Sequence, residues 1–279
     1  DVRPDGGALL LSRTRHGATE RPFATTELLE VDLETLEERS LGTLGWFGDA
    51  LYSPDGKTLL ITGSPALFGE LGQNAGDHAI ANDYDTQAYL VPVDDMPVDD
   101  PESVRPITRD LDPTVRGAEW NADGYLYFLV QDRTWNRVLR FDPKSKSDDF
   151  VNLYAIPDTV SEMDVDGGRL AYVGSSPNRP HAVYVQSTDP SDAKRSDQQP
   201  RPLLDPSAEP LADVTYGPVE PFTFTSEAGD EILGRVYYPR NFDPSKKYPL
   251  IVYYYGGTVP VDRTFGGRYP KELWAAHGY

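Results

Sequence analysis

The sequence predicts a mainly β protein built from β-propeller blades, because a tight turn recurs along it and short strands flank that turn. A turn of Asp-Gly type, followed at once by an apolar strand, occurs at four positions: Asp5, Asp55, Asp123 and Asp166. Asp-Gly is favoured in tight hairpin turns because glycine tolerates a positive φ. A hairpin unit that recurs every 40 to 70 residues or so indicates a repeat architecture.

A second strand pattern and a weaker outer segment follow each turn. In the second repeat, "TLLITG" is followed by "QAYLVPVDD" and then by "SVRPITRD". Such a repeat is a four-stranded antiparallel unit, which is typical of a propeller blade. Four repeats are predicted, the first without its opening strand, and residues 64–85 form a loop insertion in the second. The total blade number stays open, and a β-sandwich with similar hairpins is the alternative.

The composition excludes several classes of function. The formal net charge is −19, from 45 acidic and 26 basic residues, which disfavours nucleic acid and anionic membranes as partners. No apolar run approaches the length of about 18 residues that a membrane-spanning helix needs. Cysteine is absent and the four histidines are far apart, so we predict no disulfide, thiol catalysis, metal or cofactor. The compartment, and whether the acidic surface reflects a halophilic source, stay open.

The repeat stops near residue 212, and a different design follows. "EPFTFTS" alternates apolar and polar residues and predicts a half-buried strand, and "ILGRVYYP" is its partner across the turn "EAGDE". The continuous apolar stretch from Leu250 to Tyr254 predicts a strand covered on both faces. The tail "GRYPKELWAAHGY" predicts a short helix that ends at Gly278. This order of elements is typical of the first strands of an α/β-hydrolase domain.

The order of propeller and hydrolase, together with the run "DEILGRVYYPRNFDPSKKYPLIVYYYGGT", resembles the prolyl oligopeptidase family of serine peptidases, with its dipeptidyl-peptidase IV and acylaminoacyl-peptidase branches. The resemblance implies a partial β-propeller at 1–212 and the N-terminal part of an α/β-hydrolase peptidase domain at 213–279. It implies hydrolysis of short peptides through an acyl-enzyme, with the propeller gating access. It also allows a homo-oligomer formed through the hydrolase domain. Substrate specificity and exo- or endopeptidase mode stay open.

Tyr255 lies at the Tyr-Gly-Gly turn where the resemblance implies a donor of the oxyanion hole. Acyl transfer places negative charge on the carbonyl oxygen, and a preorganised donor there lowers the barrier by roughly 3 kcal/mol. The resemblance implies that Gly256 and Gly257 allow the sharp turn and leave room for the substrate backbone. On the residues alone, Tyr253 to Tyr255 are also read as β-forming residues before a turn. Tyr253 is expected on the same strand face as Tyr255.

No G-x-S-x-G motif, which marks the nucleophile of an α/β-hydrolase, occurs in the sequence. The catalytic serine, aspartate and histidine are therefore expected outside this chain, and the chain by itself is expected to be inactive. His277 is expected to cap the tail helix, and the acidic pair Glu37 and Glu38 to be solvated. Two alternatives stay open: a non-catalytic propeller that binds peptides, and an esterase or acyl hydrolase on the same scaffold.

Overall fold

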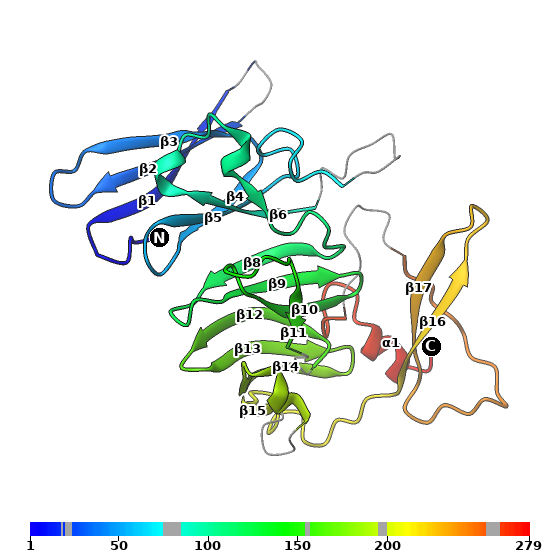
Figure 1. The fold of residues 1–279 in the computed structure, drawn as a ribbon. Coiled ribbons are helices and arrows are strands. Elements are labelled where there is room, and N and C mark those ends of the chain that lie inside the picture. The colour runs from blue at the N-terminus through cyan, green and yellow to red at the C-terminus, as the bar shows by residue number, and fades with distance from the viewer. Residues whose placement is uncertain (18, 20–23, 75–84, 154–156, 195–199, 255–262) are drawn as a thin grey trace. The chain divides into compact units, whose positions relative to one another are not determined.

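The computed structural model describes residues 1–17, 19, 24–74, 85–153, 157–194, 200–254 and 263–279. Among these residues the strands form one three-stranded, three four-stranded and one two-stranded sheet. Every sheet is a meander in which strands that follow one another in sequence pair with each other (Figure 1). The mainly β fold with blade-like four-stranded sheets is therefore confirmed.

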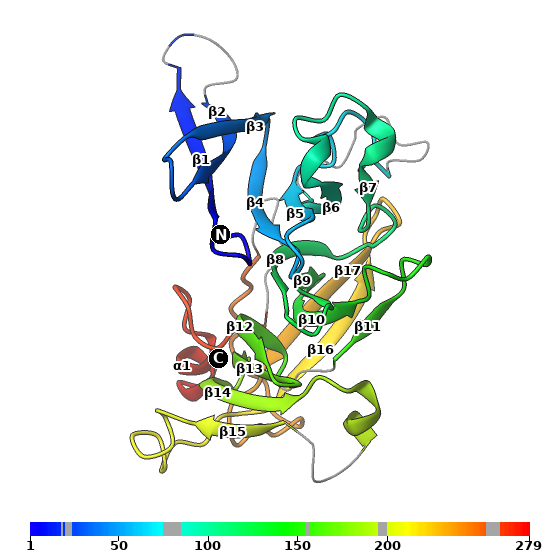
Figure 2. The ribbon, with the colours of Figure 1, turned by 60° about the vertical axis from the view of Figure 1, so that its left-hand side comes forward.

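The strands of the first four sheets follow the predicted repeats. The first sheet contains β1 (Ala8–His16), β2 (Ala24–Asp32) and β3 (Glu38–Leu44). The second, whose order is clear in Figure 2, contains β4 (Phe47–Tyr52), β5 (Thr58–Gly63), β6 (Gln87–Pro92) and β7 (Arg105–Pro106). The third contains β8 (Thr114–Trp120), β9 (Leu126–Asp132), β10 (Trp135–Phe141) and β11 (Phe150–Asn152). The fourth contains β12 (Thr159–Asp166), β13 (Arg169–Ser176), β14 (Arg179–Ser187) and β15 (Arg201–Leu204).

The described residues divide into two compact units. Asp1–Asp132, Arg137–Leu153 and Val165–Gly168 form the first, and Arg133–Asn136, Tyr154–Asp164 and Arg169–Tyr279 form the second. Three short 3-10 helices, η1 (Val93–Asp95), η2 (Pro101–Ser103) and η3 (Pro190–Lys194), lie in loops between strands. The predicted domain boundary between residues 212 and 213 stays a prediction.

The glycines of the predicted Asp-Gly turns adopt the positive φ that such turns need. The φ values are 73° at Gly6, 70° at Gly56, 89° at Gly124 and 52° at Gly167. In the first repeat, Val2 forms an isolated antiparallel bridge with Leu9 ahead of a three-stranded sheet. The sheet therefore lacks a full opening strand, as the sequence predicts.

The second sheet is buried on both faces. Leu59 and Ile61 of β5 contribute to one core and Leu60 to another, because side chains alternate along a strand. The first core also contains residues of the first sheet: Leu10, Leu28, Leu41 and Leu44. The second core also contains residues of the third sheet: Leu126, Phe128, Val130, Leu139 and Phe141. Each sheet of a two-sheet sandwich keeps one face toward solvent, so three sheets that share two cores favour blades over the sandwich.

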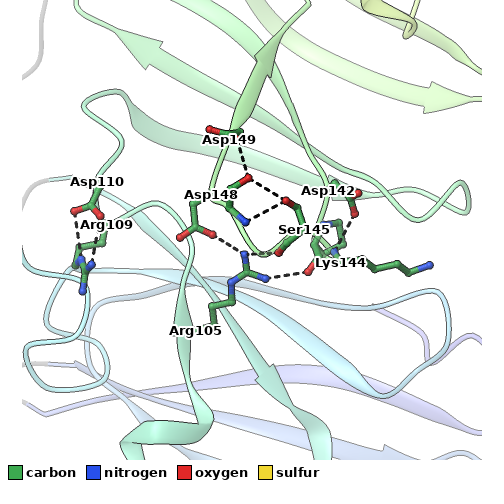
Figure 3. A network of polar contacts seen from close by, with 10 residues as sticks. Arg105, Arg109, Asp110, Asp142, Lys144, Ser145, Asp148 and Asp149 are labelled. Atoms are coloured by element: carbon green, nitrogen blue, oxygen red, sulfur yellow. Dashed lines mark hydrogen bonds and ion pairs between the residues drawn. The ribbon is translucent and has the colours of Figure 1, made fainter.

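A polar network joins the outer strand of the second sheet to a loop of the third (Figure 3). The Arg105 guanidinium donates hydrogen bonds to the carbonyl oxygens of Pro143 and Ser145 at 2.9 and 3.0 Å. It also pairs with Asp148 Oδ1 at 2.6 Å, and its Cζ lies 5.5 Å from the centre of the Phe141 ring. The network thus fixes the loop between β10 and β11.

Tyr89 makes the stability of the first core depend on pH in the alkaline range. Its ring is fully buried, its hydroxyl donates to Ser64 O at 2.8 Å, and burial raises the pKa of the phenol. An exposed tyrosine titrates near pH 10, so the stabilisation is complete below about pH 10 and is lost as the pH rises toward the folded-state pKa. We expect the free energy of unfolding to fall above about pH 10, and less steeply in Tyr89→Phe. Urea denaturation from pH 8 to 11 tests this, and equal slopes would contradict it.

The predicted hairpin and tail helix of the last region are confirmed. Strand β16 (Val219–Thr225) pairs with β17 (Glu231–Tyr237), with Thr225 opposite Glu231 at the turn. Helix α1 (Lys271–Ala276) is followed by Gly278 with a φ of 90°, the left-handed conformation that commonly ends a helix. His277 lies at the C-cap, as expected.

The predicted strand from Leu250 to Tyr254 is wrong for this structure, which gives these residues no strand pairing. A strand needs neighbours that take up its backbone hydrogen bonds, and the strands β16 and β17 pair only with each other. The side chains nevertheless alternate in exposure. Leu250, Val252 and Tyr254 are 78%, 73% and 84% exposed, against 40% and 36% for Ile251 and Tyr253.

Candidate functional site

The second unit contains an open cavity of about 970 Å³, at the upper end of the range for small-molecule sites. Four parts of the chain line it: the turn between β9 and β10, the hairpin β16–β17, residues 250–254, and the stretch from residue 263 to the C-terminal residue. The lining includes Trp135, Phe222, Ile232, Tyr253, Tyr254 and Trp274. Aromatic and aliphatic side chains therefore supply most of a surface that suits an apolar ligand or side chain.

Packed rings fix one wall of this cavity. The Tyr253 ring lies 4.5 Å from the ring of Tyr269, which lies 6.5 Å from that of Trp274 at the start of the last turn of α1. Lys271 Nζ lies 5.9 Å from the Tyr253 ring and 5.8 Å from the Tyr237 ring, within the range of cation–π attraction. Helix α1 thereby holds Tyr253 against the cavity.

The cavity is locally basic in an acidic protein. Among the described residues that line it, Arg133, Arg235, Arg263 and Lys271 are basic and Glu231 is acidic. Cations gathered in an apolar cleft attract groups that carry negative charge or strong acceptor oxygens, such as peptide carbonyls and carboxylates. Arg133 has a φ of 56°, which costs a residue with a Cβ roughly 1 kcal/mol or more, so the β9–β10 turn presents this side chain in a strained conformation.

Arg263 connects two loops of the four-stranded sheets with the C-terminal region. Its Nε donates to Thr134 Oγ1 at 3.2 Å, and its Nη1 pairs with Asp158 Oδ2 at 3.2 Å. Its Cζ lies 3.6 Å from the centre of the Trp135 ring. With only 15% of the side chain exposed, this guanidinium is held on three sides.

Burial strengthens the preference of two tyrosines near α1 for the protonated form. Burial raises the pKa of Tyr237, the nearby Glu272 carboxylate raises it further, and the guanidinium groups of Arg235 and Arg263 lower it in part. Burial likewise raises the pKa of Tyr216, again with a contribution from Glu272. Tyr237 lines the cavity, so at neutral pH its phenol is a neutral hydrogen-bonding group there.

Comparison with curated proteins gives a sequence relationship over part of the chain. The chain is 35% identical over 85 residues to dipeptidyl peptidase 8 from Mus musculus and, equally, to that from Homo sapiens. The chain is thus similar to the propeller region of prolyl oligopeptidase-family peptidases. The match covers 30% of this chain and 9% of the dipeptidyl peptidase, so the chain spans a small share of those relatives. No family model matches the chain.

Solved structures agree with this assignment at the level of the fold. The acylaminoacyl peptidase of Pyrococcus horikoshii matches with a TM-score of 0.51 at 15% identity, over 100% of this chain and 56% of that chain. A puromycin hydrolase mutant complexed with PGG matches with a TM-score of 0.55 at 19% identity, over 89% and 35% of the two chains. An acylaminoacyl peptidase in complex with Z-Gly-Gly-Phe-chloromethyl ketone matches with a TM-score of 0.51 at 14% identity, over 100% and 56%. These matches show that the chain shares the fold of the corresponding parts of those structures.

The predicted site residues lie beside or outside the residues that the structure describes. Tyr255, Gly256 and Gly257 lie outside the described residues, so their roles stay predictions. Tyr254, immediately before them, lines the cavity. Within the described parts of the chain, no helix is long and apolar enough to cross a membrane, and no cluster of three or more His, Asp or Glu side chains has the arrangement of a metal site.

The family resemblance did not identify the residues that hold the cavity wall. Arg263 contacts Thr134, which is 129 positions earlier in the sequence, and Asp158, which is 105 positions earlier. No local pattern marks such contacts, because an isolated arginine after a turn is usually solvated. Trp135 carried a weak signal, since a tryptophan directly after a hairpin turn of a blade is large enough to reach neighbouring loops.

Proposed function

We propose that the complete protein is a serine peptidase that hydrolyses short peptides through an acyl-enzyme, with the sheets of residues 1–212 as a propeller that restricts access. The observation that carries this proposal is the 35% identity over 85 residues to dipeptidyl peptidase 8. The order of elements supports it, because blade-like sheets are followed by a hairpin and then by a Tyr-Gly-Gly turn. The hairpin, residues 250–254 and α1 are, on this proposal, the beginning of an α/β-hydrolase domain.

Within this proposal, Tyr255 donates its hydroxyl to the oxyanion of the tetrahedral intermediate. Two observations support the assignment. Tyr255 directly follows residues 250–254, all of which line the cavity. Gly256 and Gly257 impose little steric restriction after it, so a sharp turn and a substrate backbone are both accommodated. The nucleophile, acid and base come from other parts of the complete protein.

The apolar and basic character of the cavity supports a peptide as the substrate. Aromatic walls suit side chains, and the arginines and the lysine suit carbonyl or carboxylate oxygens. A peptide released as a dipeptide and one released as an acylamino acid both fit this description. The cavity therefore supports peptide hydrolysis as the reaction class, and the experiment decides between dipeptidyl and acylaminoacyl release.

The test is turnover of matched chromogenic substrates by the complete protein. We expect hydrolysis of dipeptidyl or acylaminoacyl p-nitroanilides, together with covalent labelling of one serine per chain by a fluorophosphonate. Turnover of p-nitrophenyl esters without any turnover of amides would instead indicate an esterase. No turnover of either substrate and no labelling would indicate a non-catalytic propeller, and either result would overturn the proposal.

A further inference from the structure

We propose that Arg263 is a positioning residue, which ties the cavity wall that carries Tyr253 to two loops of the four-stranded sheets. The inference rests on the proposed function, because it states that the contacts of Arg263, which are remote from the reacting bond, influence the rate of peptide hydrolysis. Two steps support it: Arg263 is anchored to the sheets, and the chain that follows Arg263 is anchored to Tyr253.

The anchor on the sheets is specific for a planar cation. A charge pair with Asp158, a hydrogen bond to Thr134 and a ring contact at 3.6 Å to Trp135 hold one guanidinium. Arginine suits this arrangement because its fork of N–H groups is rigid and its plane stacks on aromatic faces, whereas a lysine ammonium is a compact point charge. The Thr134 and Trp135 contacts belong to the β9–β10 turn and the Asp158 contact to the residues just before β12.

The second step runs through the residues that follow Arg263. Phe265 N donates to Ser175 Oγ at 3.4 Å, and the Phe265 ring packs edge-on against Tyr216 at 5.4 Å. A few residues later, the Tyr269 ring packs at a tilt against the Tyr253 ring, with the ring centres 4.5 Å apart. The contacts therefore form a continuous path from the sheets to the cavity wall. A displacement of about 1 Å at such a wall can cost about 100-fold in rate, because reacting groups must be held in a near-attack geometry.

The chain offers a matched control in Arg105. Like Arg263, Arg105 pairs with an aspartate and donates to further oxygen acceptors (Figure 3). It also lies near an aromatic ring, that of Phe141. It lies in the first unit and does not line the cavity. A general loss of packing is therefore expected in both Arg105→Ala and Arg263→Ala, and a loss of positioning only in the second.

The test compares the complete protein with Arg263→Ala, Arg263→Lys, Asp158→Asn and Arg105→Ala. We expect Arg263→Ala to lower kcat for a dipeptidyl p-nitroanilide at least about 10-fold with a change in KM of no more than about twofold. Asp158→Asn and Arg263→Lys, each of which keeps part of the anchor, are expected to lie between Arg263→Ala and the wild type. Arg105→Ala is expected to keep the wild-type kcat. The double variant Arg263→Ala/Asp158→Asn is expected to match Arg263→Ala alone, because the contact that Asp158→Asn breaks is already lost in Arg263→Ala.

Hydrogen exchange separates this inference from the proposed function. We expect the amides of α1 to exchange faster in Arg263→Ala than in Arg105→Ala, whether or not the protein turns over peptides. Wild-type kcat and wild-type exchange in Arg263→Ala would overturn the inference and leave the proposed function intact. If the wild type turns over no peptide, the proposed function fails and the catalytic part of the inference fails with it, while exchange still decides whether Arg263 holds α1. If Arg263→Ala does not fold, Asp158→Asn carries the same comparison.

Discussion

Replacing Tyr255 by phenylalanine in the complete protein is expected to lower kcat for peptide hydrolysis about 100-fold, with KM within about a factor of two. Removing a single oxyanion donor in acyl-transfer enzymes has an effect of this order, since the lost hydrogen bond forms fully only in the transition state. A loss confined to the transition state lowers kcat and kcat/KM together. Steady-state kinetics on a dipeptidyl p-nitroanilide measures both quantities.

Tyr248→Phe is the matched control for this prediction. It removes one phenol of the same region, whose hydroxyl accepts a hydrogen bond from Asp243 N at 2.9 Å and does not line the cavity. We expect the control to keep the wild-type kcat. Unchanged turnover in Tyr255→Phe would remove Tyr255 from the oxyanion hole, even if the protein proves to be a peptidase.

Replacing Glu30 by alanine is expected to destabilise the first unit by about 2 to 3 kcal/mol. Glu30 is 8% exposed and accepts a 2.5 Å hydrogen bond from the Tyr52 hydroxyl. Arg3 and Arg39 lie 3.7 and 3.5 Å from its two carboxylate oxygens. Breaking a fully buried charge pair costs about 3 to 5 kcal/mol, but both arginines are partly exposed and regain water. The Tyr52 hydroxyl loses its partner and cannot regain water, and this loss contributes about 1 to 3 kcal/mol to the destabilisation.

Glu27, in the same strand β2, provides the comparison for Glu30. It pairs with Arg13 at 2.9 Å and accepts a hydrogen bond from Ser40, but its side chain is 22% exposed, against 10% for that of Glu30. We expect the midpoint of urea unfolding to fall clearly in Glu30→Ala and only slightly in Glu27→Ala. Equal shifts in the two variants would show that Glu30 is no more important to the core than a surface glutamate.

The blade-like sheets could be predicted from the sequence because their signals are local. An Asp-Gly turn and the alternating strands on either side of it specify a hairpin within about fifteen residues. The burial of the second sheet on both faces follows from the apolar run at Leu59, Leu60 and Ile61, which leaves no face of the strand for solvent. The hairpin of β16 and β17 and the helix α1 were predictable for the same reason.

The strand predicted at 250–254 was wrong because strand formation also depends on partners far along the chain. The residues favour β structure by composition, yet no described strand pairs with them, and Leu250 and Val252 remain largely exposed. The candidate site likewise divides into features that local sequence predicts and features that depend on residues far along the chain. Tyr255 could be proposed from a local turn and a family resemblance, whereas the contacts of Arg263 depend on tertiary structure that no local pattern encodes.

The most direct test of the central claim is a crystal structure of the complete protein with a peptidyl boronic acid bound to its nucleophile. The tetrahedral boronate carries an oxygen where the oxyanion forms. We predict that the Tyr255 hydroxyl lies within about 3 Å of that oxygen, and that the four-stranded sheets form a ring of blades above the site. A Tyr255 hydroxyl buried in apolar packing away from the boronate, or sheets stacked as a two-layered sandwich, would contradict the account.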